Sequence, residues 1–218
     1  MGLVRPFASV ILDADSTLAG IEGVDWLATL RGEEVARQVA ALTDDAMAGR
    51  IALEDVYVRR LELIAPTGAD LDALSRAYLE AVAPDAGTAL SELRRAGVAL
   101  RVVSGGLRDA LLPLTRTLGF DDAEVRAVEV RLDALGRFAG LVPTPLTTQA
   151  GKVRVAEELA LPRRVLAVGD GATDLAMRPS VDAFAAYVGF VRRDAVVAGA
   201  DVTVASFRDV AEVVLGQP

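Results

Sequence analysis

Val-Ile-Leu-Asp-Ala-Asp-Ser-Thr, at residues 10–17, is the stretch that predicts the fold. Its three apolar residues are typical of a β-strand that is buried on both faces. Asp13 and Asp15 follow this apolar run, and side chains two positions apart on a strand point the same way. We therefore expect both carboxylates to face one point beyond the carboxyl end of a buried strand, where open α/β sheets bind their ligands.

The two carboxylates of this stretch require a compensating partner. Close carboxylates repel each other unless a proton or a cation lies between them, and Mg²⁺ is a hard cation that prefers such oxygen ligands. The alternative is that the strand ends in an ordinary Asp-Ser-Thr turn or helix cap, since these residue types favour both. Residues 10–17 by themselves leave the two interpretations open.

Composition limits the class of protein. The chain has 218 residues, of which 52% are hydrophobic, so a large core can form and global disorder is not expected. Its net charge of −8 argues against binding to nucleic acids or anionic membrane surfaces, although a few local cations can still hold an anionic substrate. No signal peptide and no transmembrane helix are predicted.

Two residue types are missing from the chain. The absence of cysteine excludes disulfides and thiol nucleophiles, and it is compatible with a cytoplasmic location. The absence of histidine excludes His-based catalytic triads and His-ligated zinc. Catalysis would therefore depend on carboxylates, lysine, arginine, hydroxyls, backbone groups or a hard metal.

The order of the predicted elements indicates a core with an insertion. After a first strand at residues 8–14, helices follow without an intervening strand at residues 24–30, 33–47, 53–64 and 71–82. Further strands are predicted at residues 98–103, 125–132, 137–142, 165–168, 183–188 and 201–204, and helices at residues 86–96, 107–118, 152–161, 175–178 and 207–215. Repeated β-α units imply a parallel sheet with helices on both faces, and the inserted helices suggest a separate small domain.

Three further segments carry groups that could hold an anion or a metal. Residues 104–106 (Ser-Gly-Gly) follow the second core strand and open a helix, where backbone N–H groups can bind a phosphate. Lys152, the only lysine, stands at a predicted helix start, where its charge is unfavourable unless an anion lies nearby. Asp170 and Asp174 follow another apolar strand. Each segment alone could be a cap, a surface lysine or a turn, but together they indicate one site at one sheet edge.

Two residues of the predicted insertion could recognise a small charged molecule. Arg60 interrupts an apolar stripe that includes Tyr57 and Ile64, so its guanidinium could face inward and bind a carboxylate. The alternative is that Arg60 lies along the helix with its charged end in water. Glu22 comes soon after the first strand and could hold an ammonium group, or it could be an acid favoured near a helix start.

These segments together resemble the four motifs of the haloacid dehalogenase superfamily, and in particular its phosphoserine phosphatases. The matching residues are Asp13-Ala14-Asp15-Ser16-Thr17, Ser104-Gly105-Gly106, Lys152 and Gly169-Asp170-Gly171-Ala172-Thr173-Asp174. The likeness extends over nearly the whole chain and includes the order and spacing of the motifs. It implies an α/β fold, with a Rossmann-like doubly wound parallel sheet core at residues 1–17 and 84–218 and a small helical-bundle cap at residues 18–83.

The resemblance also implies catalytic and metal-binding roles. Asp13 would be the nucleophile that forms an aspartyl-phosphate, and Asp15 would protonate the leaving group and later deprotonate water. Mg²⁺ would bind Asp13, the backbone carbonyl of Asp15, and Asp170. Asp174 would support the metal site from nearby.

The remaining matched residues would bind the substrate. Ser104 and Lys152 would hold the phosphoryl oxygens and offset their charge. Glu22 would receive the ammonium group of phosphoserine and Arg60 its carboxylate, and the cap would close to exclude water. Other residues with an implied role in substrate binding are Met47, which would pack over the substrate, Gly105, Gly106 and Thr173.

Two positions depart from the pattern of the family. Thr173 stands where the family usually has Asn. Threonine offers a hydroxyl donor but lacks the longer reach of the asparagine carboxamide. Ala14 replaces a commonly larger or aromatic residue. Both changes could alter how the substrate is held.

The leading hypothesis is a Mg²⁺-dependent phosphomonoesterase that hydrolyses O-phosphoserine to serine and phosphate, in the cytoplasm and in serine biosynthesis, as a monomer or homodimer. One alternative is a phosphatase or phosphotransferase that acts on another small phosphate ester. Another is a phospho-accepting switch domain, which the insertion and Asp15 argue against, since a switch needs no leaving-group protonation. A plain α/β binding module is the remaining alternative.

Overall fold

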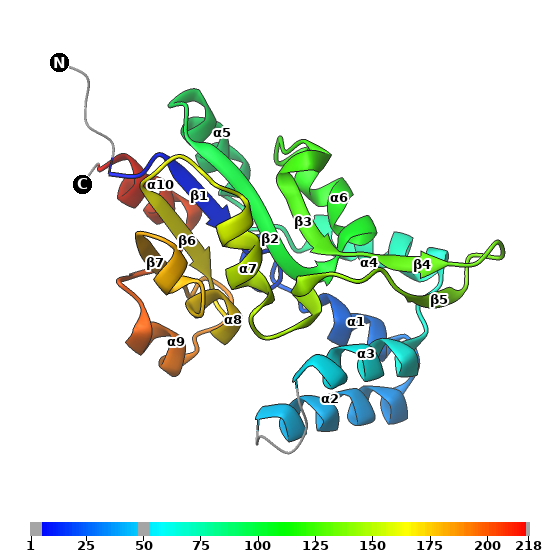
Figure 1. Cartoon of the computed structure of the whole chain (residues 1–218). Coiled ribbons are helices and arrows are strands. Elements are labelled where there is room, and N and C mark those ends of the chain that lie inside the picture. Colours follow the sequence, from blue (N-terminus) through cyan, green and yellow to red (C-terminus); the bar gives the residue numbers. More distant parts are fainter. Residues whose placement is uncertain (1–5, 48–52, 217–218) are drawn as a thin grey trace.

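The computed structural model describes residues 6–47 and 53–216, and for residues 43–47 and 53–54 it describes the backbone only. Its centre is a six-stranded parallel sheet with strand order β3-β2-β1-β6-β7-β8 (Figure 1). The strands are β1 (Ser9–Leu12), β2 (Ala99–Leu107), β3 (Val125–Val128), β6 (Val165–Gly169), β7 (Ala183–Tyr187) and β8 (Val202–Val204). Every residue of β1 is buried, as its apolar run predicts.

The order of the strands places a topological switch point between β1 and β6. From β1 the chain continues outward through β2 and β3, whereas from β6 it continues in the opposite direction through β7 and β8. Open α/β sheets bind ligands at such a point, beyond the carboxyl ends of the strands. Asp13 directly follows β1 and Asp170 directly follows β6, so the topology brings both residues to this edge.

Helices cover both faces of the sheet (Figure 1). They are α5 (Ala86–Arg95), α6 (Arg108–Thr117), α7 (Gly151–Glu158), α8 (Ala172–Leu175), α9 (Asp194–Gly199) and α10 (Phe207–Leu215). On one face α8 contacts both α7 and α9, whereas α5 and α10 pack together on the other. The predicted α/β fold with a doubly wound parallel sheet is therefore confirmed. Within residues 6–47 and 53–216, no helix has the length and apolar character needed to span a bilayer.

The described part of the chain between β1 and α5 forms four helices, as the sequence predicts. They are α1 (Gly23–Thr29), α2 (Glu33–Met47), α3 (Leu53–Ile64) and α4 (Gly68–Glu80). α2 packs against α1 and α3, and these three helices project below the sheet, whereas α4 packs against α6 of the core (Figure 1). The hydroxyl of Ser75 on α4 donates to the carbonyl of Ala110 at 2.9 Å, which strengthens the contact with α6. The boundaries of the cap at residues 18 and 83 stay a prediction.

One arginine links the ends of three inserted helices. Arg31 follows α1, and its Nε donates to the carbonyl of Ile64, the last residue of α3, at 2.7 Å. Its guanidinium also forms an ion pair with Asp70 in the first turn of α4. Asp70 and Thr67 cap the start of α4 reciprocally, since each side chain accepts a hydrogen bond from the backbone N–H of the other.

Several element boundaries differ from the predicted ones. β2 continues through residues 104–106, which were expected to open a helix, and α6 begins only after Leu107. The single strand predicted at residues 125–132 is divided, since β3 stays in the sheet while β4 (Val130–Leu132) pairs with the antiparallel β5 (Phe138–Leu141). The sequence pattern does not predict α9, and it places α8 too late. These segments are too short for hydrophobic periodicity to define their type or their ends.

Candidate active site

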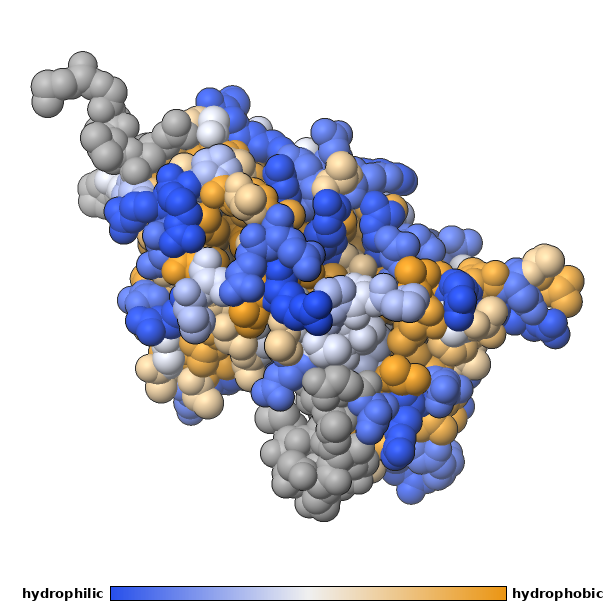
Figure 2. Space-filling view, viewed as in Figure 1, coloured by the Kyte–Doolittle hydropathy of each residue, from blue (hydrophilic) through white to orange (hydrophobic). Residues whose placement is uncertain are grey.

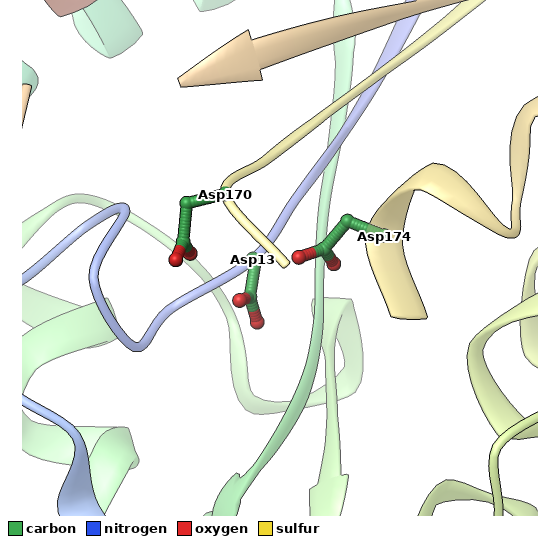
Figure 3. Close-up of side chains that lie close together, drawn as sticks. All are labelled: Asp13, Asp170 and Asp174. Carbon is green, nitrogen blue, oxygen red and sulfur yellow. The ribbon is translucent and has the colours of Figure 1, made fainter. Parts of the chain in front are cut away.

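Three aspartates meet at the switch point between β1 and β6 (Figure 3). Asp13 follows β1, Asp170 follows β6, and Asp174 belongs to α8. All three are buried, and each offers a carboxylate oxygen within 4.8 Å of the others. Figure 3 shows the carboxylate of Asp13 between those of the other two. The structure thus brings together, in what we call the aspartate cluster, residues that the sequence predicts at one sheet edge.

Close packing and hydrogen bonds orient the carboxylates of the cluster. A Cβ atom at Gly169 would lie 2.3 Å from the carboxyl carbon of Asp174, so a larger residue does not fit there. The backbone N–H of Gly171 donates to Asp174 Oδ2 at 3.0 Å. The hydroxyl of Thr17 donates to Asp170 Oδ1 at 3.1 Å, which connects the segments that follow β1 and β6.

Lys152 supplies a positive charge inside the aspartate cluster. Its side chain is 7% exposed, and Nζ lies 2.7 Å from Asp13 Oδ1 and 2.6 Å from Asp174 Oδ1. Burial disfavours the charged amine, but the charges of the two aspartates outweigh it and raise the pKa of Lys152 above its usual range. Gly151 fixes the start of α7 here, because a Cβ atom on it would lie 2.0 Å from the carbonyl oxygen of Pro145.

The charge of the aspartate cluster fits a divalent cation. The three carboxylates are buried together, Lys152 pairs with those of Asp13 and Asp174, and burial raises the pKa of the Asp174 carboxyl despite the opposing charge of Lys152. Excess negative charge on oxygen donors is what hard cations such as Mg²⁺ bind. Asp13, Asp170 and Asp174 could therefore hold a metal ion.

Asp15 lies outside the aspartate cluster and contacts the inserted helices instead. Its Oδ1 accepts a hydrogen bond from the hydroxyl of Tyr78 at 2.5 Å, and its Oδ2 accepts one from the backbone N–H of Gly23 at 3.2 Å. Burial, followed by the charges of Glu22 and Asp13, raises the pKa of Asp15 to about 7. A carboxyl group with this pKa can both give and take a proton near neutral pH.

Residues 104–106 form the carboxyl end of β2, next to β1. Ser104 is fully buried, and its Oγ accepts a hydrogen bond from the backbone N–H of Gly106 at 3.0 Å. The carbonyl of Gly105 accepts a hydrogen bond from the hydroxyl of Tyr57 at 2.5 Å. A Cβ atom on Gly105 would meet no other atom within 4 Å, so there is open space beside this backbone for a bound group.

Glu22 is engaged in an ion pair with a residue far along the chain. Its Oε1 lies 3.1 Å from Nη2 of Arg193 and accepts a hydrogen bond from the hydroxyl of Ser16 at 2.8 Å. Arg193 also forms an ion pair with Asp170 of the aspartate cluster. One guanidinium therefore neutralises both the predicted ammonium-binding residue and a predicted metal ligand.

The other predicted substrate-binding residues are placed as follows. The side chain of Arg60 is 14% exposed, with Nη2 at 2.5 Å from Oδ1 of Asp25, so Arg60 faces inward rather than along the surface. Its Nε is buried without a hydrogen-bond partner among the described residues. Thr173 is half-buried in α8. Met47 ends α2, and its side chain lies outside the described part of the structure. The roles of these residues stay predictions.

Three residues near the site are not identified by sequence reasoning. Tyr57 lies on the same helix stripe as Arg60, so that stripe could have indicated it. Tyr78 and Arg193 lie in segments without a recognisable motif. Only the tertiary packing shows that Tyr78 reaches Asp15 and that Arg193 reaches the aspartate cluster.

Comparison with known proteins identifies the family. The model of a hydrolase family, described as haloacid dehalogenase-like hydrolase, matches residues 7–182. The chain belongs to the haloacid dehalogenase-like hydrolases. This haloacid dehalogenase-like hydrolase is similar to the phosphoserine phosphatase of Mus musculus, with 31% identity over 192 residues that cover 86% of this chain and 84% of that protein. The phosphoserine phosphatase SerB2 of Mycobacterium tuberculosis is 34% identical over 173 residues, which cover 77% of this chain and 41% of that protein.

Solved structures agree with this assignment at the level of the fold. A phosphoserine phosphohydrolase-like protein from Francisella tularensis superimposes with a TM-score of 0.83 at 22% identity, over 94% of this chain and 99% of that chain. A phospho-aspartyl intermediate analogue of phosphoserine phosphatase gives a TM-score of 0.78 at 23% identity, over 95% and 98% of the two chains. The predicted family, and with it a phosphoric monoester hydrolase that resembles the phosphoserine phosphatases, is confirmed.

Proposed function

We propose that this haloacid dehalogenase-like hydrolase is a Mg²⁺-dependent phosphomonoesterase that converts O-phosphoserine to serine and phosphate through an aspartyl-phosphate. The observation that carries the proposal is the position of Asp13, buried in the aspartate cluster with Lys152 Nζ 2.7 Å from its carboxylate. A carboxylate beside a fixed positive charge is suited to attack an anionic phosphate ester. The relatives named phosphoserine phosphatase support the choice of substrate.

In the first half of the proposed reaction, a carboxylate oxygen of Asp13 attacks the phosphorus atom. The bond between phosphorus and the ester oxygen breaks, and its electron pair stays on the ester oxygen, which takes a proton from Asp15. Serine leaves, and the phosphoryl group remains on Asp13. With a pKa of about 7, Asp15 can carry that proton at neutral pH.

In the second half, Asp15 takes a proton from a water molecule, whose oxygen attacks the phosphorus atom. The bond between phosphorus and Asp13 breaks, and its electron pair restores the carboxylate. Inorganic phosphate leaves, and Asp15 is protonated again. The two halves together consume one water molecule and return both aspartates to their initial states.

Positive charge and hydrogen-bond donors would stabilise the phosphoryl oxygens. Lys152 is fixed within the aspartate cluster, and the fully buried Ser104 would donate its O–H to a phosphate oxygen while its Oγ accepts the backbone N–H of Gly106. The open space at Gly105 would admit that oxygen. Thr173 would add a hydroxyl from α8. Such preorganised donors act where charge develops in the transition state.

The same cluster would hold the metal. Asp13, Asp170 and the backbone carbonyl of Asp15 are the proposed ligands, with Asp174 in support. When bound, Mg²⁺ would offset the negative charge of the carboxylates and of the phosphoryl oxygens. The buried oxygen donors of the cluster support this choice of ion.

The amino-acid end of phosphoserine would exchange with two ion pairs of the protein. Its ammonium group would replace Arg193 at Glu22, and its carboxylate would replace Asp25 at Arg60. Met47 would then pack over the substrate, and movement of the cap would exclude water.

Phosphate release from O-phosphoserine tests the proposal. The purified protein should release phosphate from O-phosphoserine in the presence of Mg²⁺, and this release should stop when EDTA removes the metal. Asp13→Asn should be inactive, because an amide cannot act as the nucleophile, while circular dichroism shows a folded protein. Asp72→Asn, which changes an exposed carboxylate of α4, is the matched control and should keep full activity. Undiminished turnover in Asp13→Asn would exclude the mechanism.

The choice of phosphoserine is tested separately with Arg60→Ala. If Arg60 binds the substrate carboxylate, this variant should raise KM for phosphoserine by about tenfold or more, since a charge-assisted hydrogen bond is lost. It should leave KM for phosphoethanolamine, which lacks that carboxylate, nearly unchanged. An unchanged KM for phosphoserine would remove the support for this substrate.

A second candidate function is the hydrolysis of another small phosphate ester, or the transfer of its phosphoryl group to an alcohol. Two observations favour keeping it: Thr173 replaces the usual Asn, and Glu22 and Arg60 are already paired with protein side chains. Phosphate release from a panel of small esters, with and without an added acceptor alcohol, distinguishes these activities. The cytoplasmic location and the monomeric or homodimeric state stay predictions.

A further inference from the structure

Tyr78 is a fully buried tyrosine of α4 whose hydroxyl reaches the proposed acid–base residue. The hydroxyl donates a hydrogen bond to Asp15 Oδ1 at 2.5 Å, across 63 positions of sequence. α4 packs on α6 of the core, so Tyr78 stands on a firmly supported helix. Buried tyrosine hydroxyls normally find a partner, and here the partner is a carboxylate that the proposed reaction uses.

The surrounding backbone leaves room for this hydroxyl. A Cβ atom on Gly23 would lie 2.1 Å from the Tyr78 hydroxyl oxygen, and one on Gly106 would lie 3.1 Å from it. The hydroxyl therefore fills space that a side chain at Gly23 would otherwise take. Gly23 also donates its backbone N–H to Asp15 Oδ2 at 3.2 Å.

Both carboxylate oxygens of Asp15 are thus held in one orientation. Tyr78 fixes Oδ1 and Gly23 fixes Oδ2, so the carboxyl plane cannot rotate freely. Each carboxylate oxygen has two lone pairs, and each donor uses one of them. The remaining lone pairs can still carry the proton that the reaction transfers.

We propose that Tyr78 is a positioning residue that orients the Asp15 carboxyl group for proton transfer to the leaving oxygen of the substrate. This inference rests on the proposed function, in which Asp15 is the general acid. Proton transfer requires the acid to stay within a few tenths of an ångström of its productive position. Loss of the Tyr78 hydroxyl leaves Asp15 with one of its two anchors.

The leaving group of the substrate separates this role from a structural one. An alkyl ester such as phosphoserine releases a strongly basic alkoxide, which must be protonated as it leaves. p-Nitrophenyl phosphate releases a weakly basic phenolate that leaves without a proton. Asp15 also activates water in the second half of the reaction, which is the same for both esters, so the two are compared by kcat/KM, which reports only the phosphorylation of Asp13. A change that only misorients Asp15 should lower kcat/KM for the alkyl ester and spare it for the aryl ester.

The test compares Tyr78→Phe with the wild-type protein on both esters in the presence of Mg²⁺. We expect kcat/KM for phosphoserine to fall on the order of 10- to 100-fold, part of the usual contribution of general acid catalysis. We expect kcat/KM for p-nitrophenyl phosphate to fall less than about threefold. Asp15→Asn should show the same selectivity more strongly.

Tyr187→Phe is the matched control, because Tyr187 is a buried tyrosine that packs against Phe190 and Phe207, outside the site. It should leave kcat/KM for both esters unchanged. Should Tyr78→Phe fail to fold, Gly23→Ala provides the second test. Its added methyl group would displace the Tyr78 hydroxyl and should produce the same selective loss.

The outcomes separate this inference from the proposed function. Equal losses on the two esters, or no loss on either, would overturn the role of Tyr78 while the phosphatase assignment stands. A wild-type protein without activity on any alkyl phosphate ester would overturn the proposed function and this role with it.

Discussion

Arg193 Nη2 lies 3.1 Å from Glu22 Oε1, although 171 positions separate the two residues. Arg193 immediately precedes α9 and Glu22 immediately precedes α1, so the pair ties the start of the insertion to the core. The same guanidinium pairs with Asp170. Arg193 therefore contacts both the residue that precedes the first inserted helix and a carboxylate of the aspartate cluster.

Arg193→Gln should weaken the binding of phosphate esters that carry no ammonium group. The substitution removes a positive charge that neutralises Glu22 and Asp170, so the site becomes more negative and repels an anionic substrate. We expect KM to rise about tenfold, which corresponds to about 1.4 kcal/mol, with a smaller change in kcat. Steady-state kinetics at saturating Mg²⁺ measures both values.

Arg192→Gln is the control for this prediction. Arg192 precedes Arg193 and pairs only with the exposed Asp194 among the described residues, so its loss changes the net charge equally but not the site. Its KM should match the wild-type value. A similar rise in KM for both variants would assign the effect to overall charge and not to the contacts of Arg193.

Lys152→Met should destabilise the metal-free protein strongly. The change leaves the carboxylates of Asp13 and Asp174 buried without their common counter-ion. Breaking a buried ion pair in this way lowers the free energy of unfolding by about 3–5 kcal/mol. Urea unfolding at pH 7 in EDTA measures this loss. Arg178→Met, which breaks the largely exposed pair with Asp201, should cost no more than about 1 kcal/mol. An equal loss of unfolding free energy in the two variants would show that the buried pairs of Lys152 stabilise the protein no more than an exposed ion pair does.

Mg²⁺ should stabilise the wild-type protein against heat, and Asp170→Asn should abolish most of this effect. An ion that binds only the folded state at about 100 times its Kd adds about 2.7 kcal/mol to the free energy of unfolding. Asp170 is buried and offers its carboxylate to the cluster, so an amide there removes one charged donor. Differential scanning calorimetry with Mg²⁺ or EDTA provides the measurement. If Mg²⁺ raised the melting temperature of Asp170→Asn as much as that of the wild-type protein, the bound ion would lie outside the aspartate cluster.

The ion pair between Arg31 and Asp70 predicts a pH dependence of stability. The hydrogen bond from Arg31 is the main cause that lowers the pKa of Asp70 to about 2. Because the folded-state pKa lies below the unfolded value of about 3.9, the stabilisation is present above that value and is lost as the pH falls towards 2. Asp70→Asn should therefore lower stability at pH 7 by about 1 kcal/mol, and the deficit should shrink below about pH 4.

Asp72→Asn, at an exposed position of the same helix, serves as the control for this pH dependence. Its melting temperature should follow that of the wild-type protein between pH 7 and pH 3. A deficit of Asp70→Asn that stays constant over this range would show that loss of the cap at Thr67, and not the charge, causes the change.

Much of the fold follows from local patterns in the sequence. The apolar run of β1, the helices between residues 23 and 80, and the later β-α units all show their periodicity directly. The boundaries around residues 104–106 and the division of β3 from β4 could not be predicted in this way. Those boundaries depend on which neighbouring strand supplies the hydrogen bonds, as the register shift between Val103 and Leu107 shows.

The sequence by itself determined that Asp13, Asp170 and Asp174 would meet, and that Lys152 would lie beside an anion. The physical reason is that parallel strands place their carboxyl ends at one sheet edge, so residues just after those strands converge whatever the details of packing. The positions of Tyr78 at Asp15 and of Arg193 at Glu22 were decided only by the tertiary structure. Hydrophobic periodicity shows which face of an element is buried, but it does not show which distant side chain that face meets.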